Sequence, residues 1–330
     1  MRTPRRALLC LFAAACSAAP AVADDANGVE PGGPPSVIAD LVATQTHPAW
    51  RARAAARLAL ADPAALRRWA EELVATPDSP RRQELLTRLL CRWAEVDGAG
   101  AWDWALWQPS AAEATAALTA SWAAAEGEAA VAAHLAAAEH EYVRYYGGAM
   151  LVAGRLEADE AEAMRLTETL TDPDLRAGAA HRVTYAMMTR PEVADGPATG
   201  QVRDWLETRR HDPAFADAFG RMTALWGERD PYAANRWAHD LPPGPTRDRA
   251  TADGIASWAG TDPEAALDWL YEQDRGPGLD AALAATADLF EVVAPELSMA
   301  VAAEITDDDL RRAVTNDPVL LQALRQRPTP

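Results

Sequence analysis

Two neighbouring stretches decide the fold: residues 225–243 read LWGERDPYAANRWAHDLPP, and residues 257–273 read SWAGTDPEAALDWLYEQ. The two stretches match each other at a constant separation of 32 residues. The matched pairs are Trp226 and Trp258, Asp230 and Asp262, Pro231 and Pro263, and Trp237 and Trp269. A fixed period of this size indicates a structural unit that is copied along the chain.

Each copy carries the signals of a helix start. Asp262 is a favoured N-cap, because its carboxylate accepts hydrogen bonds from the amides of the first turn. Pro263 fits the first helical position, where no amide donor is needed. Ala265, Trp269 and Leu270 then fall on one face of a 3.6-residue helix. Since Pro and Gly separate the helical segments and mark turns, we expect each unit to be two short helices with tight connections.

The same pattern recurs, with some degenerate copies, in about eight units between residues 48 and 321. In the last copy, Phe290 and Pro295 stand where Trp258 and Pro263 stood. The expected helix caps are Asp62, Asp97, Asp230 and Asp262. The tryptophans expected in the repeat core are Trp69, Trp93, Trp104, Trp122, Trp205, Trp226, Trp237, Trp258 and Trp269. A row of exposed indole platforms for sugars is the alternative interpretation.

A resemblance to known repeats starts at His47-Pro48-Ala49-Trp50, which is followed by RARAAARLAL. This piece resembles the second helix of a HEAT repeat, with its Pro start, its arginine and an Ala-rich stripe ending in Leu58. At the level of whole hairpins the chain resembles tetratricopeptide-type arrays, although the period is 32 rather than 34. Residues 48–321 thus resemble the α-solenoid group. That resemblance implies an all-α superhelix that binds a protein or peptide.

The N-terminal residues are typical of an export signal. Residues 1–23 combine a positive start, an apolar run and Ala21-Val22-Ala23 before Asp24, which predicts a secretory signal peptide cleaved after Ala23. Residues 24–35 predict a flexible acidic linker rich in Pro and Gly, and residues 36–330 a single α-solenoid domain. The expected location is therefore periplasmic or secreted. A lipoprotein signal with an anchor at Cys16, in the outer membrane, and a twin-arginine signal at Arg5-Arg6 are the alternatives.

The charge balance narrows the class of partner. The formal net charge is −18, and every basic residue is Arg because the chain has no Lys. An acidic chain without a basic stripe argues against nucleic acid and against anionic membrane surfaces. It is compatible with a basic protein or peptide partner, and it also serves solubility. Beyond the leader no segment predicts a membrane span, and the single remaining cysteine, Cys91, is expected to be a buried apolar residue.

The least regular segment contains the candidate binding residues. Tyr142, Arg144, Tyr145 and Tyr146 crowd together before Gly147-Gly148. Tyr and Arg are favoured in binding hot spots, whereas Tyr can also seal a core. We therefore weigh a partner contact against an irregular structural joint. A second irregularity, residues 191–200, expands a cap loop, either to line a binding face or as a tolerated insertion.

Catalytic signatures are absent from the sequence. It contains no GxSxG, Walker, GxGxxG or HExxH pattern, so we expect no cofactor and no metal. His181, His211 and His239 occur singly and are interpreted as ordinary surface residues. The leading hypothesis is an exported scaffold, not an enzyme, that binds a protein or peptide. A polysaccharide-active enzyme on an α/α toroid and a structural subunit of a cell-envelope assembly are the alternatives.

Overall fold

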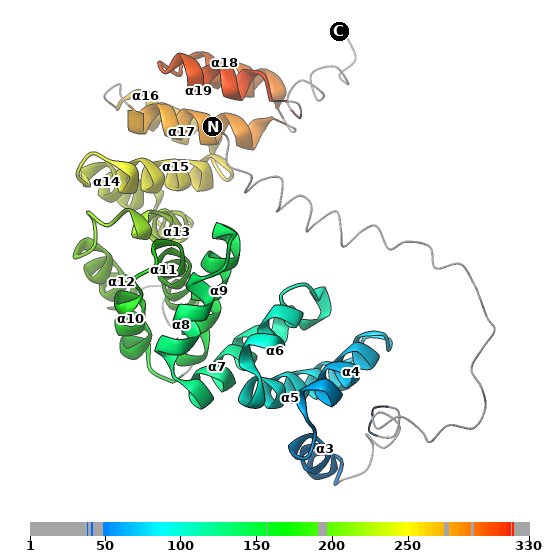
Figure 1. The fold of residues 1–330 in the computed structure, drawn as a ribbon. Helices are drawn as coiled ribbons and strands as arrows, with labels where there is room; N and C mark the ends of the chain where they lie inside the picture. The colour runs from blue at the N-terminus through cyan, green and yellow to red at the C-terminus, as the bar shows by residue number, and fades with distance from the viewer. Residues whose placement is uncertain are drawn as a thin grey trace, which may run out of the picture. The chain divides into compact units, whose positions relative to one another are not determined.

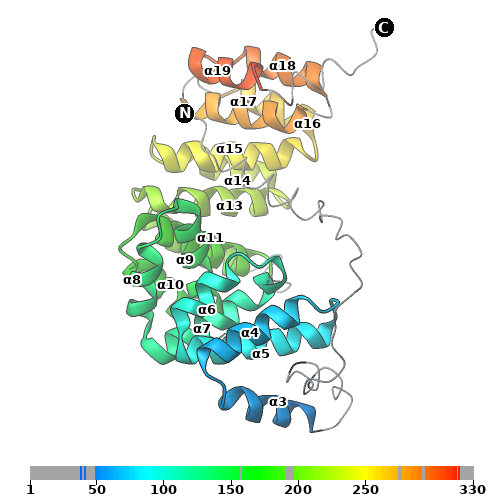
Figure 2. The same ribbon diagram turned by 45° about the vertical axis from the view of Figure 1, so that its right-hand side comes forward.

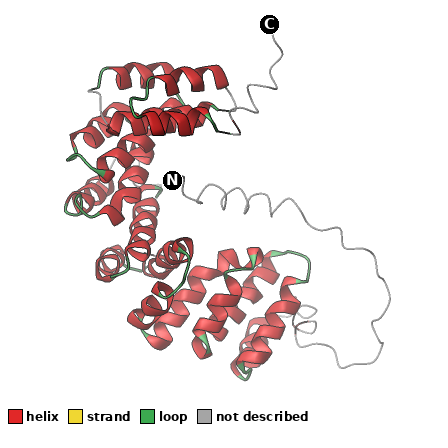
Figure 3. Cartoon of the chain, turned by 45° about the horizontal axis from the view of Figure 1, so that its top comes forward, coloured by secondary structure: helices red, strands yellow, loops and turns green. Residues whose placement is uncertain are grey.

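The computed structural model describes residues 38, 41, 49–156, 158–190, 197–273, 277–291, 294–317 and 319. These residues form seventeen α-helices and two short 3-10 helices, and no strand occurs among them (Figure 3). The all-α class is therefore confirmed. The predicted signal peptide, the linker, Cys16 and residues 191–196 lie outside the described residues. None of the described helices has both the length and the apolar character needed to cross a membrane.

The chain divides into two compact units, Met1–Ala125 and Glu126–Pro330. Within the first unit, α5 packs against α3, α4, α6 and η1, and Leu85, Leu86, Leu89 and Leu90 of α5 are fully buried. Its helices are α3 (Trp50–Ala59), α4 (Pro63–Val74), α5 (Pro80–Val96), α6 (Gly98–Ala105), η1 (Pro109–Ala114) and α7 (Thr115–Glu126). A single domain over residues 36–330 stays a prediction.

The second unit contains the longer series of helices. They are α8 (Glu128–Ala136), α9 (Glu141–Leu156), α10 (Glu160–Thr169), α11 (Pro173–Met188), α12 (Pro197–Glu207), η3 (Pro213–Phe215), α13 (Ala216–Gly227), α14 (Pro231–Asp240), α15 (Pro245–Ala259), α16 (Pro263–Tyr271), α17 (Pro277–Phe290), α18 (Pro295–Ala303) and α19 (Asp308–Thr315).

Packing in this unit follows the order of the chain. We call α9, α11, α13, α15 and α17 the odd helices, because each packs along the next one in this series. We call the helices between them, α10, α12, α14 and α16, the even helices. The first three pack against the odd helix on each side, and α16 packs against α15. Figures 1 and 2 show α13, α15 and α17 stacked in this order. Packing of each helix on its near neighbours is consistent with a helical repeat.

Pairs of indole rings eleven residues apart contact each other with nearly the same geometry in three places. The ring centroids of Trp226 and Trp237 lie 6.0 Å apart with an interplanar angle of 52°. The Trp258–Trp269 pair, 32 residues later, has 6.3 Å and 51°. The Trp93–Trp104 pair of the first unit has 5.8 Å and 43°. The spacing seen in the sequence therefore corresponds to a recurring contact between paired helices.

The corner between each of these helix pairs is built around an aspartate. Asp230 Oδ1 accepts from the amide of Ala233 at 3.0 Å, and Asp262 Oδ1 accepts from Ala265 at 3.1 Å. Asp97 and Asp62 accept in the same way from Gly100 and Ala65. The backbone angles of Asp230 (φ −140°, ψ 81°) and Asp262 (−142°, 83°) are almost identical.

The degenerate last copy keeps the backbone of this corner without its carboxylate. Ala294, at φ −146° and ψ 63°, precedes α18, and its amide donates to the carbonyl of Phe290 at 2.9 Å. Asp262 donates in the same way to Trp258. Phe290 thus occupies the place of the tryptophan, and Pro295 still supplies the fixed φ of a helix start.

The nine tryptophans expected in the core fall into two groups. Trp93, Trp122, Trp205 and Trp258 are buried, whereas Trp69, Trp104, Trp226, Trp237 and Trp269 are half-buried. In two even helices the indole nitrogen makes a hydrogen bond: Trp205 Nε1 donates to Glu168 at 2.9 Å, and Trp237 Nε1 donates to Glu207 at 3.0 Å. These bonds join α12 to α10 and α14 to α12, so the rings also connect successive even helices.

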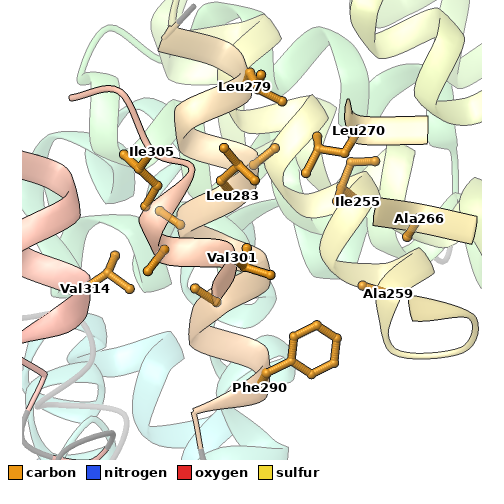
Figure 4. Close-up of a cluster of buried hydrophobic side chains, with 14 of the residues drawn as sticks. Ile255, Ala259, Ala266, Leu270, Leu279, Leu283, Phe290, Val301, Ile305 and Val314 are labelled. Atoms are coloured by element: carbon orange, nitrogen blue, oxygen red, sulfur yellow. The ribbon is translucent and has the colours of Figure 1, made fainter. Parts of the chain in front are cut away.

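The C-terminal part of the second unit encloses a continuous apolar cluster. Ile255 of α15, Leu270 of α16, Leu283 of α17 and Val301 of α18 meet there (Figure 4). Trp258 and Phe290, which hold equivalent places in successive copies, belong to the same cluster. The apolar faces predicted from the 3.6-residue spacing therefore point into one core.

Replacing Trp258 by Ala should destabilise the protein by roughly 3–5 kcal/mol, because it leaves a cavity in this cluster. Trp258 is 3% exposed, while Trp107, after α6, is 67% exposed and provides a matched control. Trp107→Ala should change the unfolding free energy by less than about 0.5 kcal/mol. Urea unfolding followed by circular dichroism measures both variants. Equal stability of Trp258→Ala and the parent would contradict the core assignment.

Candidate binding site on the odd helices

The tyrosine-rich segment lies within one continuous helix. Tyr142, Tyr145 and Tyr146 lie in the first turns of α9, and the helix continues through Gly147-Gly148 to Leu156. The rings of Tyr142 and Tyr146 are stacked, with centroids 6.3 Å apart. The ring of Tyr145 lies 6.0 Å from that of His181 on α11. The tyrosines therefore form an aromatic surface beside α11.

The two glycines Gly148 and Gly178 allow α9 and α11 to approach through their backbones. A methyl group at Gly148 would overlap the carbonyl of Leu175, and one at Gly178 would overlap the carbonyl of Tyr145. Glycine in the middle of a helix usually costs stability, and here it permits a contact that no other residue allows. At these residues the structure therefore shows a close crossing of two continuous helices.

The guanidinium group of Arg144 makes its hydrogen bonds within the protein. Its Nε and Nη2 donate to Asp174 Oδ2 at 3.0 and 2.5 Å, and its Nη1 donates to the carbonyls of Ala138 and Glu139. The side chain therefore joins the end of α8 to the start of α11. Arg176 of α11 repeats the arrangement: it donates to the carbonyl of Leu170 and lies 3.2 Å from Asp212. In both places the guanidinium acts as a connector between helices.

Polar side chains of α11, α13 and α15 lie in a row next to the tyrosines. Arg221 Nε of α13 donates to His181 Nε2 of α11 at 2.9 Å. His181 must then be neutral and carry its proton on Nδ1. Burial lowers the pKa of His181 to about 4, and the positive charge of Arg221 adds to the effect. The Arg221 guanidinium also lies over the Tyr185 ring, 5.6 Å from its centroid.

Arg249 of α15 lies further along this row, beside two carboxylates. Its Nε lies 2.9 Å from Asp253 Oδ2 and 3.5 Å from Asp217 Oδ1 of α13. Gly220 makes room for this pair, since a methyl group there would overlap the Asp253 carboxylate. Burial raises the pKa of Asp253, and Arg249 opposes that rise. The carboxylates of Asp217 and Asp253 therefore both contact the guanidinium group of Arg249.

The sequence carries a signal for this row of charges, although its residues are not among the predicted binding residues. Asp217 and Arg249 are 32 residues apart, and so are Arg221 and Asp253. Each helix places its two charges four residues apart, which is one face of a helix. The repeat therefore brings Asp217 and Arg221 next to Arg249 and Asp253. His181, interpreted as an ordinary surface residue, is half-buried at the end of this row.

Other sites offer less chemistry. Among the described residues no group of three His, Cys, Asp or Glu side chains could hold a metal ion. Cys91 is half-buried, and burial raises the pKa of its thiol. An open hollow beside the start of α10 is lined in part by Asp159, Glu160 and Arg190, and the last two form an ion pair. Neither place joins a nucleophile to a base.

The chain has no match among protein-family models, curated proteins or solved structures.

The neutral His181 predicts a specific pH dependence. Its folded-state pKa of about 4 lies below the value of about 6.5 expected in the unfolded chain. The unfolded state therefore binds more protons between these values, and stability should fall as the pH drops from about 6.5 to about 4. His181→Gln, which keeps an acceptor for Arg221 but does not titrate, should lose this part of the decline. Urea unfolding at a series of pH values measures it.

Exposed His211 provides the matched control for this experiment, since His211→Gln should follow the parent curve. A parent and a His181→Gln variant with parallel curves between these pH values would contradict the assignment of a neutral, buried imidazole.

Proposed function

We propose that this protein is an exported scaffold of helix-hairpin repeats, an α-solenoid with a period of about 32 residues, that binds a protein or peptide. The observation that carries the proposal is the row of aromatic and charged side chains on the odd helices. The row includes Tyr142, Tyr185, Arg221 and Arg249, which come from four successive odd helices. Tyr and Arg provide large contact area and directional hydrogen bonds, which partner-binding surfaces favour.

The recurring corner supports the repeat part of the proposal. Asp97, Asp230 and Asp262 cap helices in the same manner, and the paired indole rings keep their separation from one copy to the next. Because each repeat presents a new helix to the same face, such an array offers a long surface to a polypeptide. A catalytic group is not required for that role.

A polysaccharide-active protein is the second candidate, and one observation favours it. Trp107 is exposed in the first unit, and an exposed indole is a suitable platform for stacking a sugar ring. Most of the repeat tryptophans, in contrast, pack against a ring or a carboxylate of the chain itself. One exposed ring is a weaker basis for a long carbohydrate-binding surface than the row on the odd helices is for a polypeptide.

Photo-crosslinking from the two layers tests the scaffold. Tyr185 of α11 is 41% exposed on the odd helices, and Tyr271 of α16 is 48% exposed on the even helices. Each is replaced by p-benzoylphenylalanine in the producing cell. We expect protein adducts from position 185 and not from position 271, because only the first belongs to the proposed surface. Adducts from 271 alone, or none from 185, would contradict a partner on the odd helices.

Export is tested by the N-terminus of the mature protein. We expect the chain recovered from the cell envelope or medium to begin at Asp24, since cleavage after Ala23 follows the small-x-small rule. N-terminal sequencing and intact mass measure it. A lipid-modified start at Cys16 would favour the lipoprotein alternative, and a start at Met1 would contradict export.

A further inference from the structure

The Arg221 guanidinium is held in place on two sides. His181 accepts from its Nε, and the Tyr185 ring lies against its face. The side chain is half-buried between α11 and α13. A carboxylate binds a guanidinium either side-on, through Nε and one Nη, or end-on, through both Nη atoms. Because His181 occupies Nε, the end-on edge is the one that remains for a ligand.

That edge has no carboxylate of the described residues within 4.0 Å, a feature that Arg221 shares with the half-buried Arg182 and Arg247 and that several other arginines lack. Arg144, Arg176 and Arg209 of the same unit are also half-buried, and each has a carboxylate partner, namely Asp174, Asp212 and Glu168. An arginine that is half-buried without such a partner loses hydration without the usual compensation. An anion brought by a ligand would supply it.

Two carboxylates close to Arg221 in the row, Asp217 of the same helix α13 and Asp253 of α15, already contact another guanidinium. Asp217 and Asp253 both contact Arg249, at 3.5 and 2.9 Å. Burial raises the pKa of Asp253, and the positive charges of Arg249 and, more weakly, Arg221 oppose that rise. Of the two guanidinium groups in the row, Arg249 therefore has carboxylates within 4.0 Å, whereas Arg221 acts on Asp253 only at longer range.

Aromatic surfaces adjoin the open edge. Tyr185 is 41% exposed beneath the guanidinium, and Tyr145 lies beside His181. Tyr142 and Tyr146 extend the surface along α9 as a stacked pair. A ligand bound to Arg221 would thus find rings on the α9 and α11 sides of its anionic group, and an aromatic or aliphatic neighbour of that group would lie against them.

We propose that Arg221 binds a carboxylate of the partner polypeptide, with an apolar side chain of the partner packed on the tyrosines of α9 and α11. The inference rests on the proposed scaffold function and names its ligand class. The carboxylate belongs either to an acidic side chain or to a chain end, and both would accept from the two Nη atoms in the same way. His181 and Tyr185 are positioning residues that orient the guanidinium.

The test uses small probes and the whole exported chain at pH 7, where His181 is neutral. The probes are N-acetyl-phenylalanine, with a chain-end carboxylate, N-acetyl-aspartyl-phenylalaninamide, with a side-chain carboxylate, and N-acetyl-phenylalaninamide, with neither. Binding is followed by the Nε–H resonances of 15N-labelled arginine, and the Arg221 signal is assigned by its loss in Arg221→Lys. At least one carboxylate probe should bind about tenfold more tightly than the amide and shift that signal.

Variants separate the guanidinium from the apolar contact. Arg221→Gln and Arg221→Lys should each weaken the better carboxylate probe by about tenfold, since neither offers the two-pronged donor. Arg236→Gln, an exposed arginine of α14, is the matched control and should bind like the parent. Circular dichroism and urea unfolding confirm that each variant is folded.

Two results would overturn the inference. One is equal affinity of the parent protein for the acid and amide probes, a comparison that needs no variant. The other is unchanged affinity in a folded Arg221→Gln. Crosslinks from position 185 together with either result would leave the scaffold standing and remove only the carboxylate site. A preference for one carboxylate probe identifies a side chain or a chain end as the ligand group.

Discussion

The fold depends on one hydrogen-bonded corner between paired helices. In this corner an aspartate follows the end of the first helix and caps the start of the second. The amide of Asp262 donates to the carbonyl of Trp258, and its carboxylate accepts from the amide of Ala265. These two bonds fix the angle between the paired helices. Because Trp258 and Trp269 flank the corner, the fixed angle brings their rings into contact. Ala294 adopts nearly the same backbone angles without a carboxylate. Packing against neighbouring helices and the fixed φ of Pro295 are therefore sufficient to hold this corner.

The corner also determines the surface. When paired helices recur every 32 residues, side chains at equivalent positions align on successive odd helices. Asp217 and Arg221 on α13 therefore lie next to Arg249 and Asp253 on α15, with the order of charges reversed. Reversal places Asp217 close to Arg249, so the helices attract where identical copies would repel. Because the acidic and basic residues exchange places between α13 and α15, equivalent positions of the two helices form an ion pair.

Much of this architecture was predictable because its causes are local. A cap such as Asp230, its following proline and the spacing of Trp237 all lie within one hairpin, and the sequence shows them directly. The roles of Gly148 and Arg144 were not predictable in this way. In the sequence Gly148 belonged to an irregular segment without an assigned role, and the carbonyl of Leu175, on another helix, explains why a side chain is excluded there. Arg144 resembled a binding residue, but its partner Asp174 lies thirty residues away on α11.

The surroundings of Arg221 were hidden from the sequence for the same reason. Its contact with His181 spans 40 residues, because the expanded connection before α12 breaks the 32-residue register. The period that aligns Arg221 with Asp253 therefore gives no indication of His181. Elsewhere the guanidinium groups serve the fold: Arg82, Arg144, Arg176 and Arg311 all donate to carbonyls near the end of a preceding helix. Arg221 contacts an imidazole and a phenol ring instead, and neither neutralises its charge. Because Arg221 acts on the carboxylate of Asp253 only at longer range, we propose that its remaining edge binds an anionic group of a ligand.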